Sequence, residues 1–132
     1  MPCALITGTS SGFGRGVAER LHALGWDVLG TVRNAARSAG LTFETTELDV
    51  TDQVAVESLG QEVMSRWGRL DALVNNAGCI INGPVEELTP DELRHQLDVN
   101  AVGAASVTRG ARQGIEWTGS PRRPHRAIGV PD

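Results

Sequence analysis

The sequence predicts an α/β fold built on an incomplete, doubly wound parallel sheet, and three observations predict it. Short apolar runs of strand length recur along the chain. Segments with apolar residues at helical spacing separate these runs. Glycines stand at several of the junctions, where a chain must turn tightly between elements. Strands that alternate with helices in this way form parallel sheets.

The predicted elements follow one another in that alternating order. Strands are expected where short runs are rich in apolar or β-branched residues, over residues 3–7, 27–32, 42–48 and 72–75. Helices are expected over 14–24, over 52–67, and from a capping box at Thr89 and Glu92 to Arg112 at the furthest. We expect only a loop or a single turn over residues 34–41. Right-handed crossovers then give the strand order 3-2-1-4, with a ligand crevice above strands one and four.

A glycine-rich turn separates the first predicted strand from the first predicted helix. It reads Thr7-Gly8-Thr9-Ser10-Ser11-Gly12-Phe13-Gly14. Glycines let the backbone approach a phosphate closely, and a helix start offers unpaired N–H groups to it. The spacing is G-x-x-x-G-x-G rather than the commoner G-x-G-x-x-G of dinucleotide sites. Taken alone, three glycines fit an ordinary turn equally well.

Two further strand ends carry polar residues that suit a nucleotide. Arg33 follows the second strand, about where a ribose-binding acid stands in many dinucleotide sites, and no acid lies between residues 29 and 41. An arginine there suits a 2′-phosphate by charge and by geometry, and Arg37 could assist. The alternative is that Arg33 is a solvated loop residue. Asn75-Asn76-Ala77-Gly78 closes the fourth strand and by itself would be interpreted as a turn.

Together these segments resemble the classical short-chain dehydrogenase/reductase family over about residues 3–108. The resemblance implies a Rossmann-like fold that binds a nicotinamide cofactor. It points to NADP, with NAD less favoured, because Val32-Arg33 resembles the NADP-preferring branch. Asn100 matches the asparagine of the family's catalytic set. The cofactor-binding residues that the resemblance implies are Gly8, Thr9, Ser10, Ser11, Gly12, Phe13, Gly14, Arg33, Asp49, Val50, Asn75, Asn76, Ala77, Gly78 and Val99.

The sequence departs from the family pattern after Arg109. The family continues with a strand that carries a serine and then with a Tyr-x-x-x-Lys helix, whose tyrosine and lysine handle the proton. These 132 residues contain no tyrosine and no lysine, and an arginine is a poor substitute because it does not release its proton. We therefore expect a truncated or frame-altered member that is inactive, with Asn100 as the one catalytic residue retained.

A complete form would transfer hydride between nicotinamide and a carbonyl or alcohol carbon of a small-molecule substrate. Two alternatives remain open for this chain. One is a non-catalytic NADP-binding or interaction module, and the other is a non-functional truncated product. Cofactor titration distinguishes the two.

Charge and composition restrict the partners. The chain has a net charge of −4, and residues 1–108 carry 14 carboxylates against 7 arginines, which argues against a nucleic-acid partner. No apolar run is long enough to cross a membrane and no leader peptide is evident, so we expect a cytoplasmic protein. The two cysteines and three histidines share no ligand spacing, so no metal site is expected.

We divide the chain into residues 1–113, an NADP-binding Rossmann portion, and residues 114–132. The second segment is rich in arginine and proline and has almost no hydrophobic period, so we expect it to be disordered or foreign to the family. The fourth strand would stand at an open edge of the sheet. Because an unpaired apolar edge invites association, self-association is expected.

Overall fold

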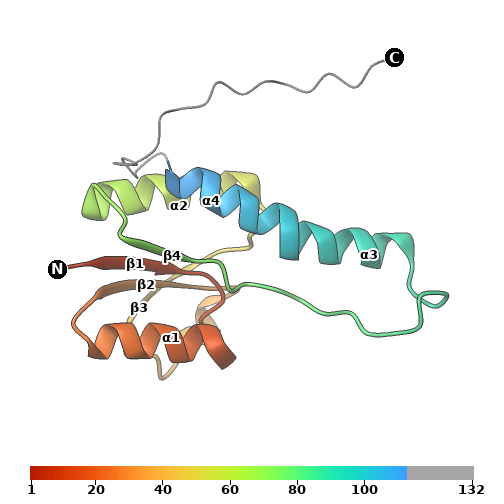
Figure 1. Ribbon diagram of the computed structural model, residues 1–132, viewed down its shortest axis with the longest axis horizontal. Coiled ribbons are helices and arrows are strands. Elements are labelled where there is room, and N and C mark those ends of the chain that lie inside the picture. Colours follow the sequence, from red (N-terminus) through yellow and green to blue (C-terminus); the bar gives the residue numbers. More distant parts are fainter. Residues whose placement is uncertain (113–132) are drawn as a thin grey trace, which may run out of the picture.

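The structure is a computed structural model, and it describes residues 1–112. Its centre is a parallel sheet of four strands in the order β3-β2-β1-β4, which confirms the predicted topology. Figure 1 shows the strands running side by side through the middle of the molecule. The strands are β1 (Cys3–Ile6), β2 (Asp27–Val32), β3 (Glu44–Glu47) and β4 (Ala72–Val74).

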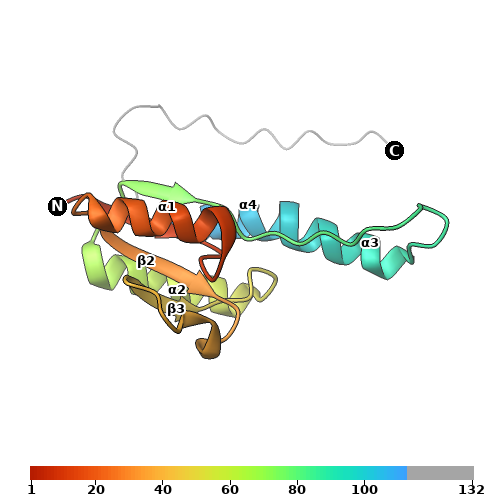
Figure 2. The same ribbon diagram turned by 90° about the horizontal axis from the view of Figure 1, so that it is seen from below.

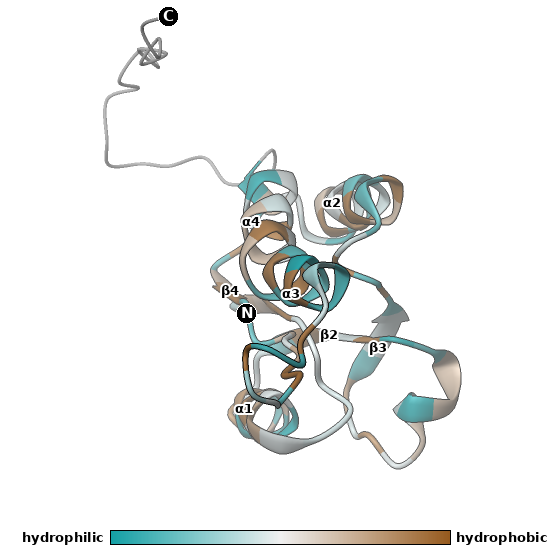
Figure 3. Cartoon of the chain, turned by 90° about the vertical axis from the view of Figure 1, so that its right-hand side faces the viewer, coloured by the Kyte–Doolittle hydropathy of each residue, from teal (hydrophilic) through white to brown (hydrophobic). Residues whose placement is uncertain are grey.

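Helices cover both faces of the sheet, as a doubly wound fold requires. One face carries α1 (Gly12–Ala23), and the other carries α2 (Gln53–Trp67) packed beside α4 (Ala104–Arg112). Figure 3 shows these layers seen from the end of the sheet. The segment between β2 and β3 holds only a 3₁₀ turn, η1 (Ala35–Ser38), in agreement with the short loop predicted there.

The core is divided by the sheet into two clusters. Successive side chains of a strand point to opposite faces. Leu5 and Leu29 therefore pack toward α2 and α4, whereas Ile6 and Val28 pack toward α1. The central strand β1 is buried along its whole length, so its apolar run serves both layers. Because the four strands are parallel, their carboxyl ends lie together at one end of the sheet, where the polar loops are found.

The final helix is interrupted, where the sequence predicts a continuous one. It consists of α3 (Pro90–Leu97), a π-helical segment η2 (Asp98–Gly103), and α4. The predicted capping box is present: the Thr89 side chain accepts from the N–H of Glu92, and the Glu92 side chain accepts from the N–H of Thr89. No residue of α3 is buried, and Figures 1 and 2 show α3 projecting beyond the sheet.

The interrupted segment makes close contacts with other parts of the chain. A Cβ added to Gly103 would lie 2.6 Å from Cγ2 of Val50, so the helix passes very near the end of β3 at this point. Asn100 uses its side chain to bind backbone outside the helix, with its Nδ2 and Oδ1 atoms each 2.8 Å from a backbone partner. π-Segments of this kind are frequent at functional sites.

Other differences from prediction are small. Helix α1 begins two residues earlier than predicted, and β3 is three residues shorter. Within residues 1–112, no helix is long and apolar enough to cross a membrane. The prediction that residues 114–132 form a separate, disordered segment falls outside the described residues, as does the boundary at residue 113.

Candidate cofactor-binding site

A cavity of about 330 Å³ lies at the carboxyl ends of the strands. This volume falls at the lower end of the range for small-molecule sites, about 300–1,000 Å³. Twelve of the fifteen predicted cofactor residues line it, and four further residues do as well. The lining residues are Gly8, Ser10, Ser11, Gly12, Phe13, Thr31, Val32, Arg33, Arg37, Leu48, Asp49, Val50, Asn76, Ala77, Gly78 and Val99.

The glycine turn is held to β2 by three hydrogen bonds. The N–H of Gly8 donates to Oγ1 of Thr31 at 3.2 Å. The N–H and the hydroxyl of Thr9 both donate to the carbonyl of Thr31, at 2.9 and 3.1 Å. Gly8 has φ of +70°, and a Cβ there would lie 2.9 Å from Cα of Ala77. Both the conformation and the close contact therefore require glycine.

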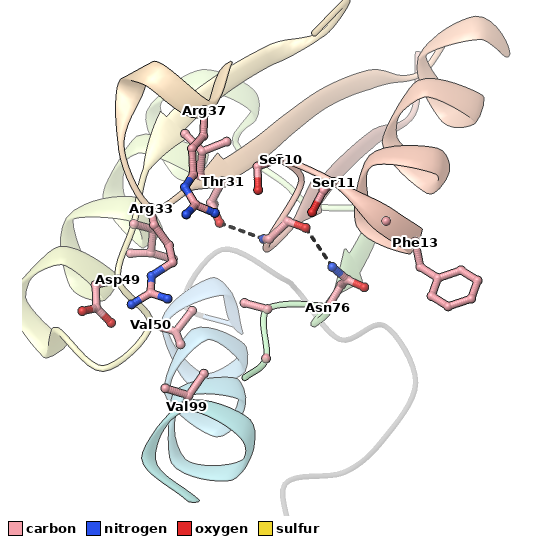
Figure 4. Close-up of a pocket in the computed structure, with 16 residues that line it drawn as sticks. Ser10, Ser11, Phe13, Thr31, Arg33, Arg37, Asp49, Val50, Asn76 and Val99 are labelled. Atoms are coloured by element: carbon pink, nitrogen blue, oxygen red, sulfur yellow. Dashed lines mark hydrogen bonds between the residues drawn. The ribbon is translucent and has the colours of Figure 1, made fainter. Parts of the chain in front are cut away.

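A second set of bonds joins the turn to the end of β4. Oγ1 of Thr7 accepts from the N–H groups of Asn76 and Ala77, at 3.1 and 3.0 Å. Nδ2 of Asn76 donates back to the carbonyl of Gly8 at 2.8 Å (Figure 4). Gly14 leaves room for this amide, because a Cβ at Gly14 would lie 2.2 Å from Nδ2 of Asn76. Gly8 and Asn76, which are 68 residues apart in the sequence, thus belong to one hydrogen-bonded unit.

The N-terminus of α1 opens toward the cavity. Ser11 is the N-cap residue, but its side chain makes no capping hydrogen bond. Gly12 has φ of +61°, and nothing lies within 4 Å of the position that a Cβ would take there. The first N–H groups of a helix lack intrahelical partners and carry the positive end of the dipole. This end of the cavity therefore suits a phosphate group.

Two arginines and one carboxylate line the other end of the cavity. Arg33 and Arg37 lie beside it near the end of β2, with Asp49 close to Arg33 (Figure 4). Hydrogen bonds from the hydroxyl and the N–H of Thr51, at 2.7 and 2.9 Å, lower the pKa of Asp49, and the charge of Arg33 lowers it further. Asp49 is therefore an anion at neutral pH. Within residues 1–112, neither arginine is in an ion pair.

Three predicted residues do not line the cavity. Thr9 is fully buried and holds the turn to β2. Gly14 is buried against Asn76. Asn75 points away, and its Nδ2 donates to Oγ1 of Thr108 on α4 at 2.8 Å. Phe13 borders the cavity, but its side chain is 90% exposed and points outward (Figure 4).

Two lining residues, Thr31 and Leu48, were not expected from the sequence. Both are buried; Thr31 lies one residue before the end of β2, and Leu48 directly follows β3. In a parallel sheet the carboxyl ends of all strands lie at the end where ligands bind, so the predicted strand ends alone could have identified both residues. Arg37, which the sequence suggested only as an assistant to Arg33, lines the cavity with it.

Asn100 is not among the residues that line the cavity, although its neighbour Val99 is. Oδ1 of Asn100 accepts from the N–H of Cys79, and Nδ2 donates to the carbonyl of Cys79, both at 2.8 Å. The side chain thus joins η2 to the loop after β4. Within the described part of the chain, no three His, Cys, Asp or Glu residues are grouped so that they could hold a metal.

The cavity as a whole fits a nucleotide. Leu48, Val50 and Val99 offer apolar contact for a flat ring, the uncapped start of α1 suits a diphosphate, and the two arginines suit a further anion. A family model described as short chain dehydrogenase matches residues 2–119.

The chain belongs to the short-chain dehydrogenase family. It is 36% identical to a 3-ketodihydrosphingosine reductase of Bacteroides thetaiotaomicron over 105 residues, covering 80% of this chain and 39% of the relative. It is 34% identical to an NADPH-dependent 3-dehydrocapnine reductase of Ornithobacterium rhinotracheale over 133 residues, covering 90% and 47%. A crystal structure of a short-chain dehydrogenase from Streptomyces avermitilis superposes with a TM-score of 0.80 at 39% identity, covering 85% and 44%.

These comparisons confirm the family resemblance and the Rossmann-like fold. They also give a fact about size: the chain spans less than half the length of each of these three proteins. The oxidoreductase family is therefore established for this chain, whereas a substrate and an activity are matters for proposal.

Proposed function

We propose that the chain binds a nicotinamide dinucleotide in the cavity and prefers NADPH to NADH. The observation that carries the proposal is the pair Arg33 and Arg37 beside the cavity at the end of β2. NADPH differs from NADH by a 2′-phosphate on the adenosine ribose, and guanidinium groups bind phosphates with paired hydrogen bonds. The name of one relative, an NADPH-dependent reductase, supports the same preference.

Other lining residues would contact the diphosphate and the adenine ring of the cofactor. The glycine turn and the start of α1 would hold the diphosphate through backbone N–H groups. Val50 and Val99 would contact the adenine ring, and Asp49 would accept hydrogen bonds from its amino group. A bound nicotinamide ring supplies a hydride to, or takes one from, a carbonyl or alcohol carbon. Asn76 would act indirectly, by keeping the glycine turn in place.

We further propose that this chain does not turn over a substrate. General acid–base catalysis contributes about 10²–10⁴ to a rate, and the tyrosine and lysine that the family resemblance calls for do not occur in these 132 residues. Incubation of the purified chain with NADPH and a panel of aldehydes and ketones should give no loss of absorbance at the reduced-nicotinamide band. Turnover that co-purifies with the chain would overturn this proposal without affecting the binding proposal.

Calorimetric titration of the chain with NADPH and with NADH tests cofactor preference directly. The variant Arg33→Ala should weaken NADPH by about 10- to 100-fold, since a hydrogen bond to a charged group contributes about 1.5–3 kcal/mol. NADH affinity should change little. Arg20→Ala on α1 is a matched control, because Arg20 is exposed and lies outside the cavity. Equal losses for both cofactors in Arg33→Ala would show that Arg33 does not bind the 2′-phosphate.

Together, the two proposals describe a non-catalytic binding module. It is favoured by the combination of a formed cavity and the missing proton-transfer pair. Tight NADPH binding without turnover would support it. Failure to bind either cofactor would contradict the binding proposal.

A further inference from the structure

The two arginines beside the cavity are held in place in different ways. Arg33 directly follows β2, and the N–H of Leu48 donates to the carbonyl of Val32 at 2.9 Å, so the sheet fixes the backbone next to Arg33. Arg37 lies four residues further on, in η1, outside the sheet. Both side chains nevertheless line the same cavity (Figure 4). The position of Arg37 relative to Arg33 therefore depends on what holds η1.

Packing contributes little to the position of η1. No residue of this turn is buried, and residues 33–37 are all exposed. The N-cap residue, Asn34, makes no side-chain capping hydrogen bond. Within the described part of the chain, residues 34–41 receive two side-chain hydrogen bonds from other elements. One of them, from Arg15 of α1 to the carbonyl of Gly40, is long at 3.4 Å.

The other hydrogen bond joins η1 to the end of β3. Oε1 of Glu47 accepts from the N–H of Ala35, the first residue of η1. The strand register explains this reach, because Glu47 stands opposite Val32, three residues before Ala35. The first N–H groups of a helical turn have no partner within the turn, and a capping side chain usually accepts from one of them. Glu47 thus supplies from the sheet the cap that Asn34 does not supply.

Glu47 contacts the backbone of η1 and not the guanidinium groups. Within residues 1–112, neither Arg33 nor Arg37 forms an ion pair, although the Glu47 carboxylate stands on the adjacent strand. A carboxylate that paired with either arginine would compete with a phosphate for the same N–H donors. The hydrogen bond to Ala35 therefore fixes η1 without occupying the groups that would bind a phosphate.

We propose that Glu47 is a positioning residue for cofactor selectivity. By capping η1, it holds Arg37 where its guanidinium can join that of Arg33 on the 2′-phosphate of NADPH. This inference rests on the NADPH preference proposed above. A group that is held in place before binding loses less conformational freedom when the ligand arrives, so its placement adds to affinity. Because NADH lacks the 2′-phosphate, Glu47 should matter for NADPH alone.

Calorimetric titration of the full 132-residue chain with NADPH and with NADH tests this role. Glu47→Ala removes the acceptor and should weaken NADPH by about 3- to 30-fold, the size of coupling expected between groups that act through one another. NADH affinity should not change, and an equal loss for both cofactors would overturn the proposal. Glu47→Gln keeps an acceptor oxygen and should retain most of the NADPH affinity. Glu44→Ala is the control, because it removes the same charge from the other end of β3 and should change neither affinity.

A double-mutant cycle shows whether Glu47 acts through Arg37. Arg37→Ala should weaken NADPH by itself. Adding Glu47→Ala should then cost little more, because no guanidinium remains on η1 to be positioned. Additive losses would mean that Glu47 contributes by another route, and they would overturn the proposal. Tighter NADPH binding in both Glu47→Ala and Glu47→Gln would also overturn it, because the effect would then be one of charge alone.

Amide hydrogen exchange in the absence of cofactor gives a readout that does not depend on affinity. Exchange at Ala35 should be faster in Glu47→Ala than in the unmodified chain, and Glu47→Gln should restore most of the protection. Unchanged exchange in Glu47→Ala would overturn the proposal. An NADPH preference that survives Glu47→Ala in full would overturn this inference alone. An unmodified chain without any preference would overturn the proposed cofactor preference together with it.

Discussion

The hydroxyl of Thr7 connects β1 to the end of β4, and its removal should be costly. Oγ1 of Thr7 is buried and accepts from two backbone N–H groups, those of Asn76 and Ala77, at 3.1 and 3.0 Å. Thr7→Val keeps the shape of the side chain but leaves both donors without an acceptor. An unsatisfied buried donor costs about 1–3 kcal/mol, and these two lie on half-buried residues, so the lower part of that range applies. We expect a loss of about 2–3 kcal/mol in the free energy of unfolding.

Thr9→Val is the matched control for this change. Thr9 is equally buried, but its hydroxyl is a donor to the carbonyl of Thr31, which also accepts the N–H of Thr9 at 2.9 Å. The substitution leaves no backbone group unpaired, so it should cost less than about 1 kcal/mol. Urea unfolding at a concentration where the chain is monomeric gives both values, provided that the slopes agree. Losses that are equal within about 0.5 kcal/mol would refute the argument from unpaired donors.

Three further predictions follow from other contacts. Gly60→Ala should lower the free energy of unfolding by about 1–3 kcal/mol, because the new Cβ would lie 2.8 Å from the carbonyl oxygen of Gly110. Gly16→Ala is the control, because nothing lies within 4 Å of its Cβ position, and it should raise the free energy of unfolding by up to about 1 kcal/mol. Urea unfolding measures both changes. Thr31→Val should weaken NADPH and NADH equally in calorimetric titration, because its hydroxyl holds the glycine turn, and a selective loss of one cofactor would contradict this. Because the pKa of Asp49 is lowered in the folded chain, its carboxylate stabilises the fold above the ordinary aspartate pKa of about 3.9, and this contribution is lost as pH falls below that value. Asp49→Asn should therefore make the free energy of unfolding depend less steeply on pH in the acid range. An unchanged pH dependence would count against this role of Asp49.

The sequence was sufficient for the topology of the sheet and for the end of the sheet at which most of the predicted cofactor residues gather. Apolar runs and helical spacing are local patterns, and each predicts the type of one element and the face that it buries. Right-handed crossovers then left a single strand order, which the structure confirms. The glycine turn and the Asn75–Gly78 segment follow β1 and β4, so their meeting at the same edge of the sheet could also be expected. Twelve of the fifteen cofactor residues that the sequence predicts line the cavity for this reason.

Which side chains face the cavity was decided by contacts between distant segments. Asn75 and Asn76 are adjacent in the sequence, yet the first binds Thr108 on α4 and the second binds the glycine turn. The close approach of Gly103, within η2, to Val50 is likewise a contact between distant segments. No local pattern encodes such distances, because they arise only when elements are packed.

By itself, then, the sequence determined the types of element, their order, the glycine turn and the absence of tyrosine and lysine. The tertiary structure decided that Thr31 on β2 and Asn76 after β4 hold the glycine turn from its two sides, and that Arg37 joins Arg33 beside the cavity. The physical reason is the distance along the chain over which each kind of interaction acts. Propensity and periodicity act over a few residues, whereas a binding site is made of groups that are brought within 3–4 Å of one another by burying the elements between them.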